Sequence, residues 1–356
     1  MSYSHDLRIV MEKVRSKYVA SKIDRELGEA IACLLVNHAF RANPTVGSTN
    51  ENRPEGRLLV LTGPSGAGKT KTLTRVIRRH PLLQGYELDG PDGPLVSVTV
   101  TSPCTLKQLG RDTVSTVGYP LERDLKEHLV WERTRFRLKD RKKILLIFDE
   151  MQHITQTVNA AEQVKVANTI KDLMINLEWR SSIIVCGLPA VADFIRGDEQ
   201  LKRRATFLQM KHLRMPYDNG DIAAMITGLA EVAGLTAQGD DEIAPRLIHA
   251  AGGRLGVAVE VTQDAIEMAL VPAYLESDEA DDEIALHGSR DAATPGVLAI
   301  HHFAKAFGRR SGNADDENPF VSRDWTGTMA PKPTPPDGPP QPRRRRSRKT
   351  SGGNGR

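Results

Sequence analysis

What most restricts the possible folds of this chain is its loop Gly63-Pro-Ser-Gly-Ala-Gly-Lys-Thr70. The loop lies between a short apolar run at 57–62 and a helical stretch at 71–79. It matches the pattern GxxxxGK[ST] at every fixed position. In that pattern, glycines let the backbone curl so that N–H groups point at phosphate oxygens, and the following helix adds its positive dipole end. The segment therefore predicts a nucleotide phosphate site between a buried strand and a helix.

Two side chains of this loop have predicted chemical tasks. Lys69 is expected to reach the β- and γ-phosphates, which also makes it a candidate catalytic residue, and the Thr70 hydroxyl is expected to coordinate Mg²⁺. The predicted nucleotide-binding residues of this segment are Gly63, Pro64, Ser65, Gly66, Ala67, Gly68, Lys69, Thr70 and Lys71.

A second chemical feature is the apolar run 143–148, which ends in Asp149 and Glu150. At the carboxyl end of a parallel strand, Asp149 is expected to lie beside the phosphate loop and to bind Mg²⁺. Glu150 follows directly, where a carboxylate can orient and polarise an attacking water. The pair therefore favours hydrolysis of the nucleotide over phosphoryl transfer to a small acceptor.

The order of apolar runs along the chain indicates the fold class. Runs at 57–62, 95–100, 144–148 and 183–186, and a weaker one at 207–213, alternate with helical stretches at 106–117, 121–138 and 160–177. Strands that alternate with helices predict an α/β fold, in which a parallel sheet carries helices on both faces.

Changes in pattern divide the chain into four expected parts. They are an N-terminal helical segment and loop (1–56), a core that contains the phosphate loop (57–217), a helical domain without a convincing strand (218–310) and a Pro-rich basic tail (311–356). The tail contains seven prolines between Pro331 and Pro342, followed by the basic run 343–349. Because such a segment buries too little apolar surface to offset its ordering entropy, we expect it to be disordered.

Bulk properties exclude some classes of protein. The net charge is only +4, so a nucleic-acid function has to be argued from local charge. The three cysteines, Cys33, Cys104 and Cys186, show no CxxC spacing, which argues against a zinc site or a disulfide framework. No stretch has the roughly 18 to 20 apolar residues of a membrane helix. We therefore expect a cytoplasmic protein that does not bind membranes.

Three arginines are candidates for contacts with the phosphates. Arg204, or as a second choice Arg203, precedes the last predicted strand and could reach the γ-phosphate of a neighbouring subunit to stabilise transition-state charge. Arg254 lies near a predicted helix start and could contact bound phosphates. For each of the three, a solvated surface arginine is an alternative interpretation. The strand end at 186–188 offers no polar side chain to sense the γ-phosphate.

These segments resemble AAA+ ATPases, and more narrowly the ATPase subunits of DNA transposition systems in the TniB and TnsC group, with MuB a more distant relative. The resemblance covers about residues 15–270. It rests on the phosphate loop, on Val117-Gly-Tyr-Pro120, on the segment IFDEMQHI at 147–154 and on the basic residues 202–204. The chain departs from the group's pattern because no phenylalanine directly follows those basic residues.

The resemblance implies a mechanism as well as a fold. It implies ATP as the nucleotide, Mg²⁺ as the metal, and a P-loop AAA+ sheet followed by a helical lid. ATP-bound subunits would form a homo-oligomer, a ring or a helical filament, on duplex DNA without sequence preference. That assembly would recruit or activate a DDE-type transposase, and hydrolysis would dismantle it.

DNA contacts are the least constrained part of the sequence interpretation. Lys107 and Arg111 follow the second predicted strand, in the region where the resemblance places DNA, but a solvated helix face explains them equally well. Two other functions remain open. One is a helicase-loader or initiator-like AAA+ ATPase, and the other is a DNA-independent, nucleotide-switched signalling scaffold.

Overall fold

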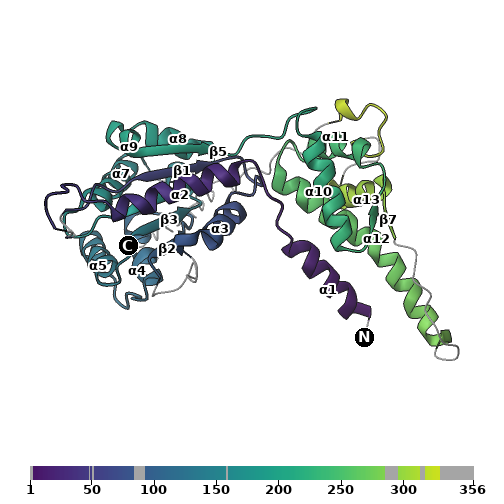
Figure 1. Cartoon of the computed structure of the whole chain (residues 1–356), viewed down its shortest axis with the longest axis horizontal. Coiled ribbons are helices and arrows are strands. Elements are labelled where there is room, and N and C mark those ends of the chain that lie inside the picture. Colours follow the sequence, from purple (N-terminus) through teal and green to yellow (C-terminus); the bar gives the residue numbers. More distant parts are fainter. Residues whose placement is uncertain are drawn as a thin grey trace, which may run out of the picture.

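The computed structural model describes residues 3–47, 49, 52–83, 93–157, 159–284, 296–312 and 317–328. Figure 1 shows a sheet covered by helices next to a second part made almost entirely of helices. The predicted α/β class, with a helical part after the sheet, is confirmed.

Five parallel strands form the central sheet in the order β2-β3-β4-β1-β5. They are β1 (Leu58–Thr62), β2 (Leu95–Thr99), β3 (Leu145–Asp149), β4 (Ser182–Gly187) and β5 (Ala205–Gln209). The first four match the predicted runs. The last strand begins two residues earlier than expected, because Ala205 to Gln209 pair in parallel register with Leu58 to Thr62 of β1.

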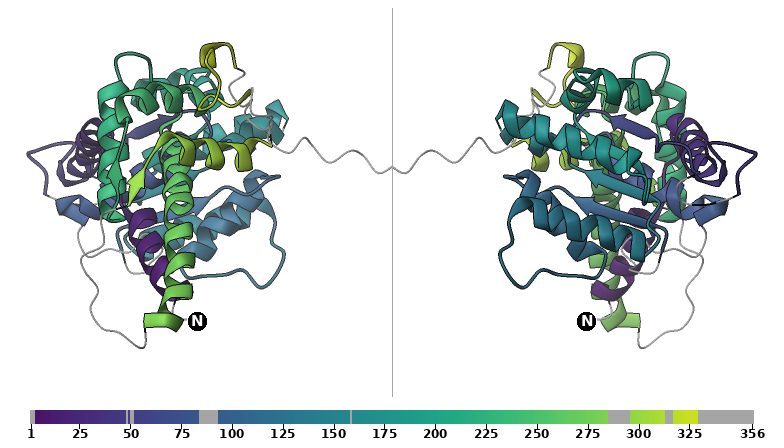
Figure 2. Two further views of the ribbon diagram at one scale, coloured as in Figure 1. Left: turned by 90° about the vertical axis from the view of Figure 1, so that its right-hand side faces the viewer. Right: turned by 90° about the vertical axis from the view of Figure 1, so that its left-hand side faces the viewer.

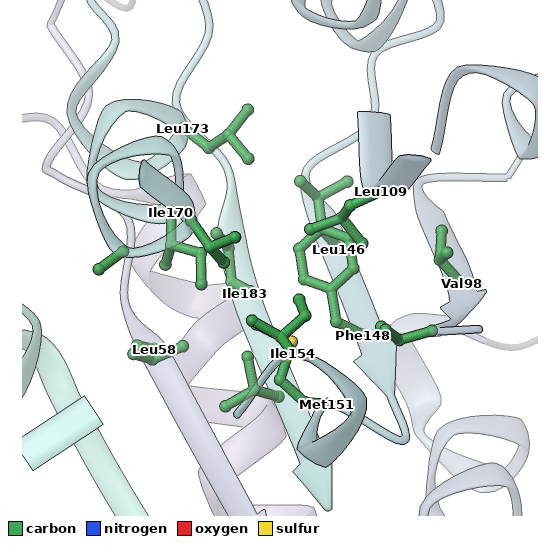
Figure 3. Packing of buried hydrophobic residues seen from close by; sticks show 14 of the residues in the cluster. Leu58, Val98, Leu109, Leu146, Phe148, Met151, Ile154, Ile170, Leu173 and Ile183 are labelled. Carbon is green, nitrogen blue, oxygen red and sulfur yellow. The ribbon is translucent and has the colours of Figure 1, made fainter. Parts of the chain in front are cut away.

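Alternate residues of each strand pack on opposite faces of the sheet, which is why the runs are apolar throughout. Leu58 and Val60 face one buried cluster with α4 (Leu106–Thr116), α7 (Ala160–Ile175) and α8 (Pro189–Arg196), part of which Figure 3 shows. Leu59 and Leu61 face a second cluster with α2 (Ile23–Ala39) and α3 (Lys69–Arg79).

Shorter elements complete this part. They are α5 (Glu127–Asp140), α6 (Gln152–Thr157), α9 (Glu199–Arg204) and a single 3-10 turn at Pro81–Leu83. The helix α5 begins six residues later than the expected 121, because the backbone carbonyls of Leu121 and Arg123 accept hydrogen bonds from Arg111 of α4 instead of helical partners.

The helical part contains α10 (Asn219–Val232), α11 (Asp240–Ala250), α12 (Leu255–Ile284) and α13 (Ile300–Ser311). A two-residue parallel pair, β6 (Thr236–Ala237) with β7 (Val297–Leu298), was not predicted. The hydrophobic core of the helical part also includes Met11 and Val14 of α1 (Tyr3–Ser16), and α1 packs along α12 (Figure 2). We call this assembly of α1 and α10–α13 the lid.

The chain after α13 corrects one expectation. We expected disorder from residue 311, yet residues 317–328, here called the C-terminal strap, pack on the lid. Phe320 is 4% exposed and lies against Phe303 and Phe307. Arg246 of α11 donates hydrogen bonds to the carbonyls of Pro319 and Ser322 at 2.7 and 2.9 Å. The Pro-rich segment and the basic run at 343–349 lie outside the described residues.

Within the described ranges, no helix has both the length and the apolar composition needed to cross a membrane.

Candidate nucleotide site

The phosphate loop lies at the carboxyl end of β1 and continues directly into α3. Gly66 and Gly68 adopt left-handed backbone angles, with φ of 75° and 93°, which a residue with a Cβ adopts only with strain. Gly68 is the N-cap of α3, so the free N–H groups of the first helical turn face the loop. The local backbone is thus that of an anion-binding loop in front of a helix N-terminus.

The side chains of Lys69 and Thr70 both have hydrogen-bond partners at the phosphate loop and the acidic pair. The Lys69 ammonium is buried within the loop and donates to the carbonyls of Gly63 and Pro64 at 3.1 and 3.0 Å. The Thr70 hydroxyl donates to an oxygen of Asp149 at 2.6 Å, although the two residues are 79 positions apart. A hydroxyl and a carboxylate oxygen side by side are ligands that suit Mg²⁺, so the donor set fits this ion.

Glu150 has an unusual backbone conformation. Its φ is 57°, in the left-handed region that costs free energy for a residue with a side chain. Its N–H donates to Asp149 at 2.8 Å, and one of its carboxylate oxygens accepts from the side-chain amide of Gln152. The turn therefore directs two adjacent carboxylates to different partners. Asp149 accepts a hydrogen bond from Thr70, and Glu150 accepts one from Gln152.

The sequence interpretation assigned no role to Gln152. Its side chain is 7% exposed at the start of α6 and accepts a hydrogen bond from the N–H of Leu188 at 3.2 Å. The available signal is the glutamine three positions after Asp149, within the segment IFDEMQHI.

Cys186 occupies the end of β4 next to this acidic pair. Burial, together with the nearby charge of Asp149, raises the pKa of the Cys186 thiol well above its usual value. The thiol is therefore neutral at physiological pH and adds no charge to the site.

The structure does not bring Arg203 and Arg204 to the phosphate loop of their own chain. Both end α9, before β5, and β5 runs parallel to β1. They therefore lie at the opposite end of the sheet from the loop, a strand length of roughly 16 Å away. Arg204 bonds Glu55 through Nε and Nη2 at 2.8 and 2.7 Å, whereas Arg203 is exposed.

The lid touches the phosphate loop at the start of α12. A Cβ on Gly256 would lie 2.4 Å from the carbonyl oxygen of Gly66, so only glycine permits this contact. Arg254 lies two residues earlier, after Gly252 and Gly253, and its Nε donates to the carbonyl of Ala251 at 2.8 Å. The guanidinium of Arg254 is thus hydrogen-bonded within its own turn, and its contact with bound phosphates stays a prediction.

A cavity of about 840 Å³ opens beside Ala67 of the loop. Its walls come from the α1–α2 connection, from the β5–α10 connection and from the lid, and include the apolar residues Val19, Ile222 and Leu255. It has the volume and the apolar lining of a small-molecule pocket.

Lys107 and Arg111 lie one turn apart on α4. Lys107 forms an ion pair with Asp124 at 2.6 Å, and Arg111 lies 3.7 Å from the same carboxylate. Arg111 also donates to the carbonyls of Leu121 and Arg123, both at 3.2 Å. The two predicted DNA-binding residues thus hold the 117–126 connection in place.

The ATPase core contains most of the residues that match a known protein family. Residues 46–215 match the family described as bacterial TniB protein. A search of curated proteins gave no match.

Similar solved structures show the fold alone. One is Cdc6p of Pyrobaculum aerophilum, with TM-score 0.50 and 14% identity over 75% of this chain. The match spans 66% of Cdc6p, just under two thirds of its length. Another is ORC1 of Aeropyrum pernix, solved in complex with DNA, with TM-score 0.50 and 15% identity, covering 85% of this chain and 81% of that protein.

Proposed function

Because residues 46–215 match the TniB family and carry both the phosphate loop and the pair Asp149–Glu150, we propose that this chain is an AAA+ ATPase that assembles on duplex DNA in its ATP-bound state. The assembly recruits or activates a DDE-type transposase, and hydrolysis of ATP dismantles it. This proposal assigns the chain no DNA cleavage of its own.

For hydrolysis, we assign the residues at the carboxyl ends of β1 and β3. Thr70 and Asp149 would hold Mg²⁺, which would neutralise charge on the phosphates of the nucleotide. Lys69 contacts the same phosphates, together with the N–H groups of the loop. Glu150 accepts a proton from the attacking water. The cavity beside Ala67 accommodates the adenine base between core and lid.

Assembly is supported by one observation above all, the position of the two arginines before β5. Because Arg203 and Arg204 lie at the opposite end of the sheet from their own phosphate loop, either could act only on the nucleotide of a neighbouring copy. Arg203 is exposed, and Arg204 has to exchange its contact with Glu55 to do so. A repeating head-to-tail contact of this kind produces a ring or a helical filament.

For DNA, we propose phosphate contacts at Lys107 and Arg111. Both side chains remain partly exposed, and a phosphate could share them with the single carboxylate of Asp124. Each phosphate contact that is lost should reduce the slope of log affinity against log salt by about 0.9. Arg111→Gln should therefore lower that slope equally on unrelated duplex sequences, since backbone contacts carry no sequence information.

The deciding experiment measures ATP hydrolysis with and without random-sequence duplex, in the wild type and in Glu150→Gln. We expect weak basal turnover, stimulation by duplex, and a loss of about 10²- to 10⁴-fold in the variant with ATP binding retained. The variant should also form an ATP-dependent assembly that sediments with DNA.

Two results would redirect the proposal. If duplex changed neither turnover nor assembly at low salt, where phosphate contacts are strongest, a DNA-independent scaffold would replace it. If the assembled protein bound a replicative helicase and no transposase, the initiator-like function would replace it.

A further inference from the structure

The carboxyl end of β4 faces the acidic pair without contributing a polar side chain of its own. Its residues are the buried Cys186, Gly187, which has no side chain, and the apolar Leu188. The space in front of Gly187 is filled instead by the amide of Gln152, which comes from α6. A Cβ on Gly187 would lie 2.6 Å from the side-chain oxygen of Gln152, so the glycine is what makes room for it.

Both ends of this amide have assigned partners. The N–H of Leu188 can only donate, so it requires the oxygen of Gln152, which lies at 3.2 Å. The amide nitrogen then points to Glu150 and donates to its Oε2. The amide therefore cannot turn over without losing both hydrogen bonds, and its orientation follows from the donors present.

Burial of Gln152 strengthens its two hydrogen bonds. Gln152 is 7% exposed, so bulk water competes little for either bond. The Glu150 backbone, at a φ of 57°, sets the direction in which the carboxylate leaves the chain, and the amide fixes one of its two oxygens. The other oxygen is left to accept a proton from water.

We propose that Gln152 is the positioning residue for Glu150, and that it supplies from α6 the polar group that β4 lacks. This inference rests on the proposed role of Glu150 in hydrolysis. The second bond of the amide reaches Leu188, the N-cap of α8, and α8 packs on α9, which ends in Arg203 and Arg204. Gln152 thus connects the carboxylate that activates water to the helices that carry the trans-acting arginines.

The test separates the rate of the chemical step from nucleotide affinity. Gln152→Met keeps the length of the side chain and removes both hydrogen bonds. We expect single-turnover hydrolysis at saturating ATP to fall by about 10- to 100-fold, because Glu150 is no longer held in a productive position. The dissociation constant for ATP should stay within about twofold, because the side-chain hydrogen bonds of Gln152 go to Glu150 and Leu188, which lie outside the phosphate loop.

A matched control is Gln263→Met. Gln263 is also 7% exposed, and its amide donates to the carbonyl of Val14 in the lid. This variant should lose a similar amount of stability and keep the single-turnover rate. If both variants lowered the rate equally, Gln152 would have only a structural role, and the inference would be overturned.

A second substitution tests the same contact from the other side. Gly187→Ala places a Cβ against the Gln152 oxygen and should lower the single-turnover rate. In the Gln152→Met background it should lower the rate by less than it does in the wild type, since the contact with the amide oxygen is already lost and only those with Val191 and the backbone of residue 152 remain. Fully additive effects would contradict the inference.

Failure of the inference and failure of the proposed function give different results. If Glu150→Gln retained hydrolysis, the proposed role of Glu150 would be wrong and the inference would fall with it. If Glu150→Gln abolished hydrolysis while Gln152→Met kept the single-turnover rate, only the inference would be wrong.

Discussion

The ATPase core and the lid are specified by the sequence in different ways. In the core, each functional group lies on a short contiguous segment, and each buried strand is one contiguous apolar run of the sequence. The lid instead gathers its buried residues from α1, from α10–α13 and from the C-terminal strap. One ion pair, between Arg15 of α1 and Glu267 of α12, joins residues 252 positions apart. The lid therefore depends on both ends of the described chain, and the core does not.

The largest predicted difference in stability between the core and the lid comes from a substitution in the C-terminal strap. Phe320→Ala removes a buried ring packed between Phe303 and Phe307, which should cost about 3 to 5 kcal/mol of lid stability. Hydrogen exchange followed by mass spectrometry should show faster exchange in α11 and α13. Exchange in β1, β3 and β4 should be unchanged, because their buried clusters contain no strap residue.

Val321 provides the control for that substitution. It is the next residue of the strap and is 52% exposed, so Val321→Ala should leave exchange in the lid unaltered. If Phe320→Ala accelerated exchange in the central sheet as strongly as in the lid, the two parts would unfold as one unit, and the contrast would fail.

The second prediction compares the two parts in catalysis. Lys69→Ala removes a buried cation from the phosphate loop and should lower the hydrolysis rate by about 10²- to 10³-fold. Arg254→Ala, in the lid, should change the rate at saturating ATP far less, because its guanidinium bonds the carbonyl of Ala251. Rapid-quench assays at saturating ATP measure both rates. Equal losses would mean that the lid arginine takes part in the chemistry.

The sequence predicted the core better than the lid for a physical reason. The loop 63–70 and the pair Asp149–Glu150 combine a local backbone pattern with chemical groups, and parallel pairing then brings Thr70 to Asp149. The apolar character of the five runs was enough to predict the strands. The position of α1, the pair β6–β7 and the strap depend on tertiary contacts, which periodicity does not encode.

Within the site, the residue that sequence reasoning missed is also explained by tertiary contact. Gln152 matters because Gly187 of another strand leaves space for it and Leu188 donates to it. In the same way, the bond between Arg204 and Glu55 joins residues 149 positions apart. The sequence indicated which residue types gather near the loop, and only the fold shows which of them are in contact.

The third prediction uses one histidine from each part. Burial, with a smaller effect of Arg53, lowers the pKa of His38 to about 4 from its usual 6.5. Burial, with His301 and Lys305, lowers the pKa of His302 to about 4. In both cases the unfolded chain binds the proton more readily. The free energy of unfolding should therefore fall as the pH drops from about 6.5 toward 4.

For His38 the loss should approach about 3 kcal/mol at the acid end of this window, at 1.36 kcal/mol per pKa unit. His38→Gln should flatten the pH dependence of unfolding in the core, and His302→Gln should flatten it in the lid. Urea titrations at pH 7 and pH 4.5, followed by exchange in each part, measure this. The assignment of these histidines would be wrong if both variants kept the wild-type pH dependence.

The smallest predicted effect compares two partly exposed arginine ion pairs, one from each part. Arg204 pairs with Glu55 in the core, and Arg310 pairs with Glu260 in the lid at 2.7 Å. Because solvent screens both pairs, Glu55→Gln and Glu260→Gln should each cost only about 0.2 to 1 kcal/mol of stability.

The effects of these two substitutions on hydrolysis should differ. Glu55→Gln frees Arg204 for the nucleotide of a neighbouring copy and should raise hydrolysis per subunit in a manner that depends on protein concentration, whereas Glu260→Gln should leave that dependence unchanged. Titrating the protein at fixed ATP and duplex DNA distinguishes the two variants. An unchanged concentration dependence in Glu55→Gln would leave Arg203 as the arginine that acts in trans.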